Sequence, residues 1–240
     1  RSTYWETFLI GLRNLTTYNT DVNETNYSLL QMPLYKEPAF HYTEIPKLNY
    51  TRTLLFGYYQ SYRYFDKYND TIQNMINLPK QQTLIKNEYH DLFLDKETIS
   101  MHFRLGDYKN IQESHPILTI EYYYNAICSI TMNQDKPYRI LYFCQKNDNV
   151  DVSQIILGLS NRFPSLEFVK VDDSIDDWKQ LLIMSTCSHN IIANSTYSWW
   201  AAWFNMNINK IVCYPNVWFG PIVSHDTCDL FPSSWTKIHW

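Results

Sequence analysis

Several features are scarce or absent in this chain, and each absence narrows the class of protein. Among 240 residues there are 5 glycines and 5 cysteines, and no two cysteines form a Cys-x-x-Cys pair. An odd number of cysteines without metal-ligand spacing argues against a disulfide framework and against a zinc site. The sequence also contains no Asp-x-Asp pair. Paired carboxylates for a magnesium or manganese ion are therefore not indicated, and we expect no metal cofactor.

The chain also has no long basic run, no signal peptide and no apolar stretch long enough to span a membrane. With a net charge of −4, it is not expected to bind nucleic acid. It begins with Arg1 instead of Met. We therefore expect a piece of a longer polypeptide, with any anchor or targeting segment outside it.

What the sequence does contain is an ordinary globular balance that is rich in aromatic residues. Hydrophobic residues make up 45% and charged residues 18%, which is enough apolar surface for a core. There are 20 tyrosines and 8 tryptophans. Aromatic rings fill the core in any fold, and they also line sugar or nucleobase sites, so both interpretations stay open. The length fits one large domain or two small ones.

Two regions of the chain differ in how regular their hydrophobic pattern is. Residues 1–95 have few clean hydrophobic periods and are predicted to form a smaller N-terminal lobe. In this region we predict a helix at Tyr4–Leu15, a strand at Thr53–Tyr59 and a helix at Ser61–Ile76. Pro79 interrupts the pattern, so residues 77–83 are predicted to be a connector.

Residues 96–240 alternate regularly between strand-like and helix-like segments. The predicted strands are Thr98–Arg104, Arg139–Cys144, Leu166–Val171, Asn190–Ala193 and Lys210–Tyr214. The predicted helices are Thr119–Met132, Val150–Arg162, Asp176–Cys187 and Thr196–Asn205. This alternation predicts an α/β fold with a Rossmann-type parallel sheet, right-handed crossovers and helices on both faces. Because parallel strands end at the same edge, ligands are expected beside their carboxyl ends.

A first polar cluster follows the strand at Thr98–Arg104. His102 and Arg104 are two residues apart, so in a strand they point to the same face. Burying an arginine at the end of a strand costs free energy unless its charge is paired with an anion. A diphosphate is such an anion, because its oxygens can accept two parallel hydrogen bonds from the guanidinium. Gly106 would let the backbone turn and approach a ligand closely. The alternative is an ion pair between Arg104 and Asp107 that closes a turn.

A second polar cluster follows the strand at Asn190–Ala193. Asn194 ends the apolar strand, and the next helix opens with Ser195 and Thr196, followed by Ser198. The N-terminus of a helix presents unpaired N–H groups and the positive end of its dipole, which suits a phosphate. The alternative is a plain helix cap, which needs no ligand. Two anion-friendly groups at one sheet edge favour a binding site over two separate local features.

These clusters resemble the motifs of the α-1,2-fucosyltransferase family (glycosyltransferase family 11). The family's H-x-R-x-G-D-Y, H-P and N-S-T-[FY]-S-W-W segments correspond to residues 102–108, 115–116 and 194–200. Residues 37–42 are similar to its E-x-x-F-H-Y segment, residues 57–61 to its G-Y-F-Q-S segment, and residues 182–185 also fit. The resemblance covers about residues 35–220, and the first and third motifs together are highly specific.

The resemblance implies a GT-B-like fold with two Rossmann-type lobes and the nucleotide sugar on the C-terminal lobe, residues 96–240. It implies that Arg104 grips the β-phosphate of GDP-fucose, with Ser195 and Thr196 on the same diphosphate and His102 supporting the pocket. An acid near Asp172 or Asp177 would take the guanine or ribose, although Asp177 is equally well explained by its place at a helix start. The family's opening G-x-L-G-N-Q-[ML]-F segment is absent, so the N-terminal lobe, residues 1–95, which the resemblance implies to be the acceptor side, is expected to be incomplete.

The reaction implied is an inverting, metal-independent transfer of fucose from GDP-fucose to a hydroxyl of a galactoside or related glycan. Asp107 is the candidate general base, with Glu113 and His115 as alternatives. Two other functions stay open: a transferase of the same fold with another nucleotide sugar, and a non-catalytic module that binds a nucleotide or a sugar. Among compartments, the cytoplasm is favoured, and the Golgi lumen is the alternative if an anchor precedes the chain.

Overall fold

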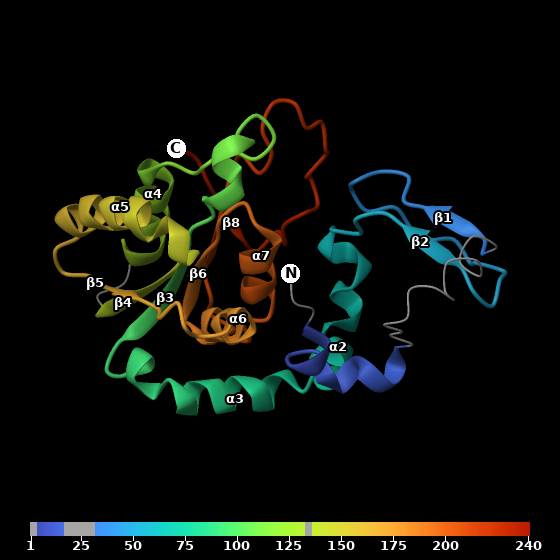
Figure 1. Ribbon diagram of the computed structural model, residues 1–240, viewed down its shortest axis with the longest axis horizontal. Coiled ribbons are helices and arrows are strands. Elements are labelled where there is room, and N and C mark those ends of the chain that lie inside the picture. The colour runs from blue at the N-terminus through green and yellow to red at the C-terminus, as the bar shows by residue number, and fades with distance from the viewer. Residues whose placement is uncertain (1–3, 17–31, 133–135) are drawn as a thin grey trace. The chain divides into compact units, whose positions relative to one another are not determined.

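The computed structural model of the chain describes residues 4–16, 32–132 and 136–240 (Figure 1). It divides into two units. Unit 1 comprises residues 1–76 and 224–232, and unit 2 comprises residues 77–223 and 233–240. The lobes proposed from the sequence, residues 1–95 and 96–240, stay a prediction about function. The structural units divide earlier in the chain, and a distant segment, residues 224–232, packs with unit 1.

Unit 2 contains a sheet of six parallel strands. Their order across the sheet is β5-β4-β3-β6-β7-β8. The strands are β3 (Glu97–His102), β4 (Tyr138–Phe143), β5 (Glu167–Lys170), β6 (His189–Ile191), β7 (Val212–Pro215) and β8 (Thr236–Ile238). The chain fills the sheet outward from β3 on one side, and then returns to the other side of β3 with β6. This order confirms the predicted Rossmann-type class and creates a topological switch point between β3 and β6.

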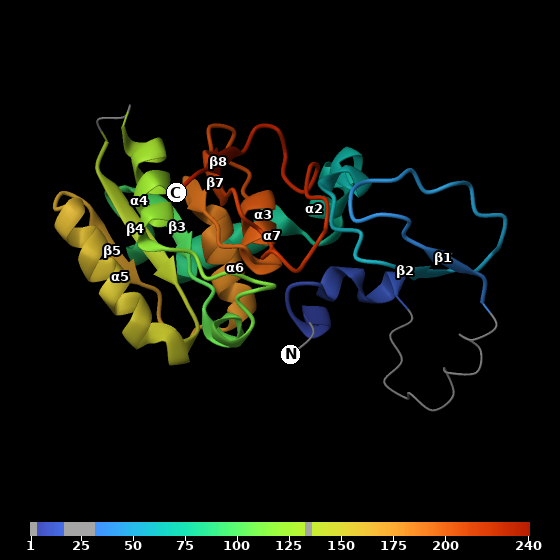
Figure 2. The same cartoon turned by 90° about the horizontal axis from the view of Figure 1, so that it is seen from above.

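Helices cover both faces of this sheet. Figure 2 shows α4 (Ile120–Thr131) and α5 (Asn149–Arg162) on one face, and α3 (Leu78–Glu88), α6 (Asp177–Thr186) and α7 (Thr196–Trp203) on the other. Four of these helices lie where the sequence predicted them. The predicted connector at residues 77–83 is wrong, because this segment begins α3. Pro79 lies in the first turn of the helix, where its missing N–H is not needed, and Asn77 precedes the helix with a left-handed backbone.

The core of unit 2 holds the carboxyl ends of the strands in place. Strand β3 is buried from its second residue to its last. Two fully buried tyrosines of α4 carry their hydroxyls to strand ends. Tyr122 donates to the carbonyl oxygens of Ile192 at 2.5 Å and Cys213 at 3.2 Å, and Tyr123 donates to His102 O at 3.3 Å. A buried tyrosine hydroxyl needs such a partner. These bonds therefore tie α4 to the carboxyl ends of β3 and β6.

Unit 1 is less regular than its sequence suggested. Its sheet consists of β1 (Leu34–Lys36) and β2 (Leu54–Phe56), which pair in parallel. The predicted helix at Tyr4–Leu15 forms two short 3-10 helices, Tyr4–Glu6 and Ile10–Leu15. The predicted helix at Ser61–Ile76 breaks into 3-10 turns, Tyr62–Tyr64 and Asp66–Tyr68, followed by α2 (Asn69–Met75). Within the described residues, strands β1 and β8 were not predicted.

All five cysteines lie in the described part of the chain and all are free. Cys144, Cys187 and Cys213 are buried and Cys128 is half-buried, as expected for apolar segments, while Cys228 is exposed. Among the helices of the described residues, none combines the length and the apolar character that crossing a bilayer requires.

Candidate functional site

The two polar clusters meet at the switch point of the sheet. Strands β3 and β6 are direct neighbours, with Met101 paired to Ile191. Arg104 follows the end of β3 by two residues, and Ser195 follows the end of β6 by four. At a switch point the two connections leave in opposite directions, which opens a crevice beyond the strand ends. The sequence predicted a common edge for both clusters, and the strand order adds that they are adjacent.

The guanidinium of Arg104 has two neighbours within its own cluster. Its Nη2 lies 2.5 Å from Oδ1 of Asp107, and its Cζ lies 5.0 Å from the ring centre of Tyr108. The ion pair that the sequence left as an alternative is therefore present. The arginine side chain is 11% exposed and the aspartate side chain is 62% exposed. An ion pair with so exposed a partner is held weakly, so an incoming anion can replace the carboxylate.

Tyr108 connects the two clusters, a role that sequence reasoning missed. Its hydroxyl donates to the backbone oxygen of Asn194 at 3.1 Å, while one side of its ring faces the Arg104 guanidinium. His115 stacks on the same ring with a centroid separation of 4.8 Å and an angle of 22°. The pKa of His115 lies below its ordinary value, mainly because of burial. Asp107 raises this pKa and Arg104 lowers it. The imidazole therefore interacts electrostatically with both charged groups.

Gly106 serves a tight packing contact. Its φ of +34° is unfavourable for other residues, and a Cβ there would lie 2.4 Å from Oε1 of Gln145. Its N–H donates to Oδ2 of buried Asp148 at 2.8 Å, and Lys109 pairs with the other oxygen of that carboxylate at 3.0 Å. The glycine thus fastens the loop after β3 to the loop after β4. The close approach to a ligand that the sequence suggested for Gly106 stays a prediction.

In the second cluster, Ser195 and Thr196 differ in exposure, because Ser195 is buried. Ser195 is the N-cap of α7, with an extended backbone and no side-chain cap hydrogen bond to any described residue. Thr196 is exposed. Ser198 is also buried, and its hydroxyl donates to Ser195 O at 3.2 Å. Buried Asn194 donates its amide to Pro116 O at 2.8 Å and so holds the His115–Pro116 loop. The geometry favours donor contacts from Ser195 and Thr196 over Ser198 and Asn194.

His102 is a neutral, buried side chain at the end of β3. Burial, with a further contribution from Arg104, lowers its pKa to about 3. Its Nδ1 makes no hydrogen bond with any described residue, and its ring lies 5.4 Å from that of Tyr197. At neutral pH His102 therefore carries no charge toward an anion. It can support the crevice by packing against Tyr197 and by offering one ring nitrogen as a donor or acceptor.

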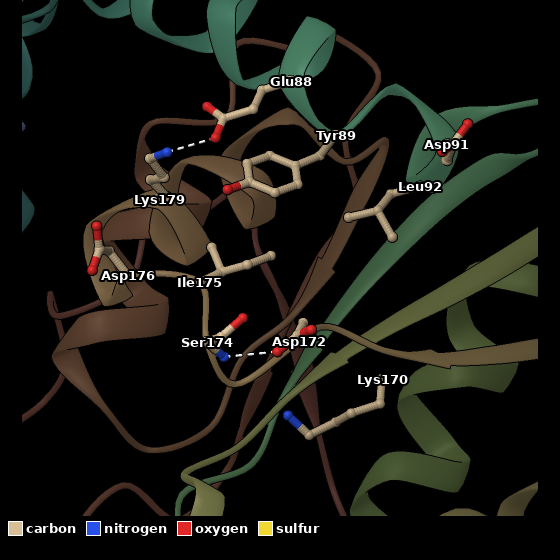
Figure 3. A pocket seen from close by; sticks show the side chains of 10 residues that line it. All are labelled: Glu88, Tyr89, Asp91, Leu92, Lys170, Asp172, Ser174, Ile175, Asp176 and Lys179. Carbon is tan, nitrogen blue, oxygen red and sulfur yellow. Dashed lines mark hydrogen bonds and ion pairs between the residues drawn. The ribbon is translucent and has the colours of Figure 1, made fainter.

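The two candidate aspartates of the β5–α6 region lie in different surroundings. Asp177, in the first turn of α6, is exposed, and its backbone oxygen accepts from the Tyr197 hydroxyl at 2.5 Å. That bond joins the starts of α6 and α7. Asp172 lines a cavity of about 510 Å³, where its Oδ1 accepts from Ser174 N at 2.8 Å (Figure 3). The cavity is also lined by Glu88, Tyr89, Asp91, Leu92, Lys170, Ile175, Asp176 and Lys179.

Comparison with known proteins decides the family. The model for glycosyl transferase family 11 matches residues 17–239. The chain belongs to glycosyl transferase family 11. Two relatives from Escherichia coli are similar to it: the O-antigen biosynthesis glycosyltransferase WbnK, 29% identical over 191 residues, and an alpha-1,2-colitosyltransferase, 27% identical over 188 residues.

The chain spans about three fifths of the length of these family 11 relatives, 60% and 61%, while the matches cover 77% and 76% of the chain itself. Among solved structures, it is similar to the NodZ alpha-1,6-fucosyltransferase co-crystallised with GDP, with a TM-score of 0.41 and 12% identity. That match covers 65% of this chain and 53% of the other.

Proposed function

We propose that the protein is an inverting, metal-independent glycosyltransferase that moves fucose from GDP-fucose to a hydroxyl of a galactoside or related glycan. Membership of family 11 supports the reaction class. The observation that carries the proposal is the meeting of Arg104 and the N-terminus of α7 at the switch point between β3 and β6. A guanidinium and an open helix end in one crevice form a site for a diphosphate.

In the proposed reaction, the bond between the anomeric carbon and the β-phosphate oxygen breaks, and its electron pair leaves with GDP. An acceptor hydroxyl forms the new bond from the opposite face and gives up its proton. Negative charge grows on the leaving diphosphate, where Arg104 and the first N–H groups of α7 stabilise it. Fixed donors of this kind act most strongly where charge develops in the transition state, and they can replace a metal ion.

The Arg104–Asp107 ion pair gives Asp107 a defined part in this scheme. When a diphosphate takes the guanidinium, the carboxylate loses its partner at 2.5 Å and becomes free to accept the acceptor's proton. Donor binding would thereby activate the base. His115, stacked on Tyr108, is the alternative base, because burial keeps its imidazole neutral and able to accept a proton.

The contact to the nucleoside is proposed to come from Asp177 or Asp172. Asp177 is favoured, because the hydrogen bond from Tyr197 ties its backbone to the first turn of α7, beside the proposed diphosphate position. A carboxylate there can accept two hydrogen bonds from the Watson–Crick edge of guanine. Replacing Asp177 with Asn should weaken GDP binding, and Asp172→Asn serves as the comparison.

The donor is tested by titration calorimetry of the full-length protein with GDP, UDP and dTDP. Binding of GDP alone supports the proposal, and preference for UDP or dTDP contradicts it. A colitosyl donor is the second candidate, since one relative is an alpha-1,2-colitosyltransferase. Transfer assays with GDP-fucose and GDP-colitose separate the two sugars. If the full-length protein binds GDP but neither transfers nor hydrolyses any donor, the non-catalytic alternative replaces the enzyme.

A further inference from the structure

Unit 1 contains a cluster of aromatic rings that includes a highly exposed tyrosine. Phe40 and His225 stack face to face, with centroids 4.3 Å apart and an angle of 4°. Tyr58 packs edge-on against both, at 5.9 Å from Phe40 and 5.7 Å from His225. Even so, 68% of Tyr58 remains exposed. A tyrosine braced by two rings and still open to solvent has a fixed surface ready for a ligand.

The backbone beneath Tyr58 is fixed as firmly as its ring. The buried carboxylate of Glu37 accepts hydrogen bonds from Tyr58 N at 2.7 Å and from Tyr59 N at 3.1 Å. Tyr59 has a φ of 47°, a left-handed conformation that is unfavourable for a bulky residue. A Cβ at Gly57 would lie 2.3 Å from the Glu37 Cβ. Local strain held by charge-assisted hydrogen bonds typically occurs at binding sites.

Polar groups stand beside the rings. His41 follows Phe40 and Asp226 follows His225, and their side chains approach to 3.5 Å between Nδ1 and Oδ2. Both side chains are well exposed, 44% for the histidine and 57% for the aspartate. The other aspartate oxygen accepts from Cys228 N at 2.9 Å, which orients the carboxylate. An oriented acceptor and an imidazole donor therefore belong to the residues that directly follow the two stacked rings in the chain.

We propose that this aromatic cluster, made of Phe40, Tyr58, His225, His41 and Asp226, binds a sugar ring of the acceptor glycan. A pyranose has a face of C–H groups and a rim of hydroxyls. The C–H groups carry partial positive charge and suit the negative face of Tyr58, while the hydroxyls can donate to Asp226. The proposal rests on the proposed function, because it names the site for its second substrate.

The test compares glycan binding with donor binding in the full-length protein. Binding is measured on an array of galactose-, N-acetylglucosamine- and mannose-terminated oligosaccharides, followed by saturation-transfer NMR with the best glycan. Tyr58→Ala should weaken glycan binding or raise the acceptor KM at least tenfold, with an unchanged Kd for GDP. Tyr58→Phe keeps the ring and should retain binding. Tyr50→Ala, which removes another exposed tyrosine of the same unit, is the matched control.

Each outcome decides the matter. Unchanged glycan binding in Tyr58→Ala, or no glycan bound by the wild-type protein, overturns the proposal. So does a dimer in solution that Tyr58→Ala separates without any effect on glycan binding, because the surface would then serve a second copy of the chain. If the wild-type protein does not bind GDP, the proposed donor is wrong. The glycan measurements would still test this cluster independently.

Discussion

Unit 2 places its candidate residues through strand order, whereas unit 1 places them through bonds between a side chain and the backbone. In unit 2, buried β3 and its neighbour β6 end side by side and fix the positions of Arg104 and Ser195. In unit 1, β2 is exposed throughout, and the Glu37 carboxylate holds the turn that carries Tyr58. A large core positions a site mainly through strand order, and bonds such as that from Tyr108 to Asn194 O support it, while a small sheet depends on specific polar contacts.

The largest effect that would test this comparison of the two units is expected at Arg104. We expect Arg104→Ala to lower kcat/KM at least about a hundredfold, the usual effect of removing a donor to transition-state charge. GDP affinity should also fall, as measured by calorimetry. Arg162→Ala is the control, since it removes an arginine of the same unit that pairs with Glu121 at 3.0 Å. Wild-type kinetics in Arg104→Ala would mean that the switch point does not hold the donor.

A substitution at Asp107 tests whether this partner of Arg104 acts as the general base. Replacement by Asn keeps a hydrogen-bond acceptor for Arg104 but cannot take a proton, so kcat should fall about a hundredfold, within the range of general base catalysis. The Kd for GDP should change little. Asp151→Asn, which alters an exposed carboxylate paired with Lys109 at 2.6 Å, is the control. If kcat is unchanged, His115→Gln becomes the next variant to measure.

Glu37 tests the polar support of unit 1. Glu37→Gln replaces one acceptor oxygen with a donor that faces two backbone N–H groups. We expect a loss of about 1.5–3 kcal/mol in the free energy of unfolding, the usual range for hydrogen bonds to a charged group. Denaturant unfolding measures it. The exposed Glu44→Gln provides the baseline for the same unit. A stability equal to that baseline would show that the turn at Tyr58 does not depend on the carboxylate.

His102 links the site of unit 2 to pH. Its folded pKa of about 3 lies below the ordinary value of 6.5, so between those values the unfolded chain binds a proton that the folded chain does not. Stability therefore falls as pH drops from 6.5 toward 3, by up to about 1.4 kcal/mol per pH unit from this group. His102→Gln should flatten that slope, whereas His90→Gln, at an exposed histidine, should not. Equal slopes in both variants would contradict the burial of His102 as a neutral group.

The elements of unit 2 were largely predictable because burial repeats locally along the chain. Strands β3 to β7 and helices α4 to α7 lie within a few residues of their predicted bounds, while β8 was not predicted. Helix α3 was missed, since Pro79 resembles a breaker until its place in the first turn is known. In unit 1 the aromatic residues lack a clean period. Among the described residues of that unit, the sequence found the strand near Leu54–Phe56 and, within the helix predicted at Ser61–Ile76, only the part that forms α2.

The sequence by itself determined which residues are the candidates for the chemistry, because Arg104, Asp107 and the start of α7 belong to motifs that resemble one family. Only the tertiary structure decided which of them meet. Strand order is a matter of pairing between distant segments, and no spacing along the chain encodes it. For the same reason Tyr108, which joins the two clusters, and His225, which joins Phe40 across more than half of the chain, became visible only once the chain was folded.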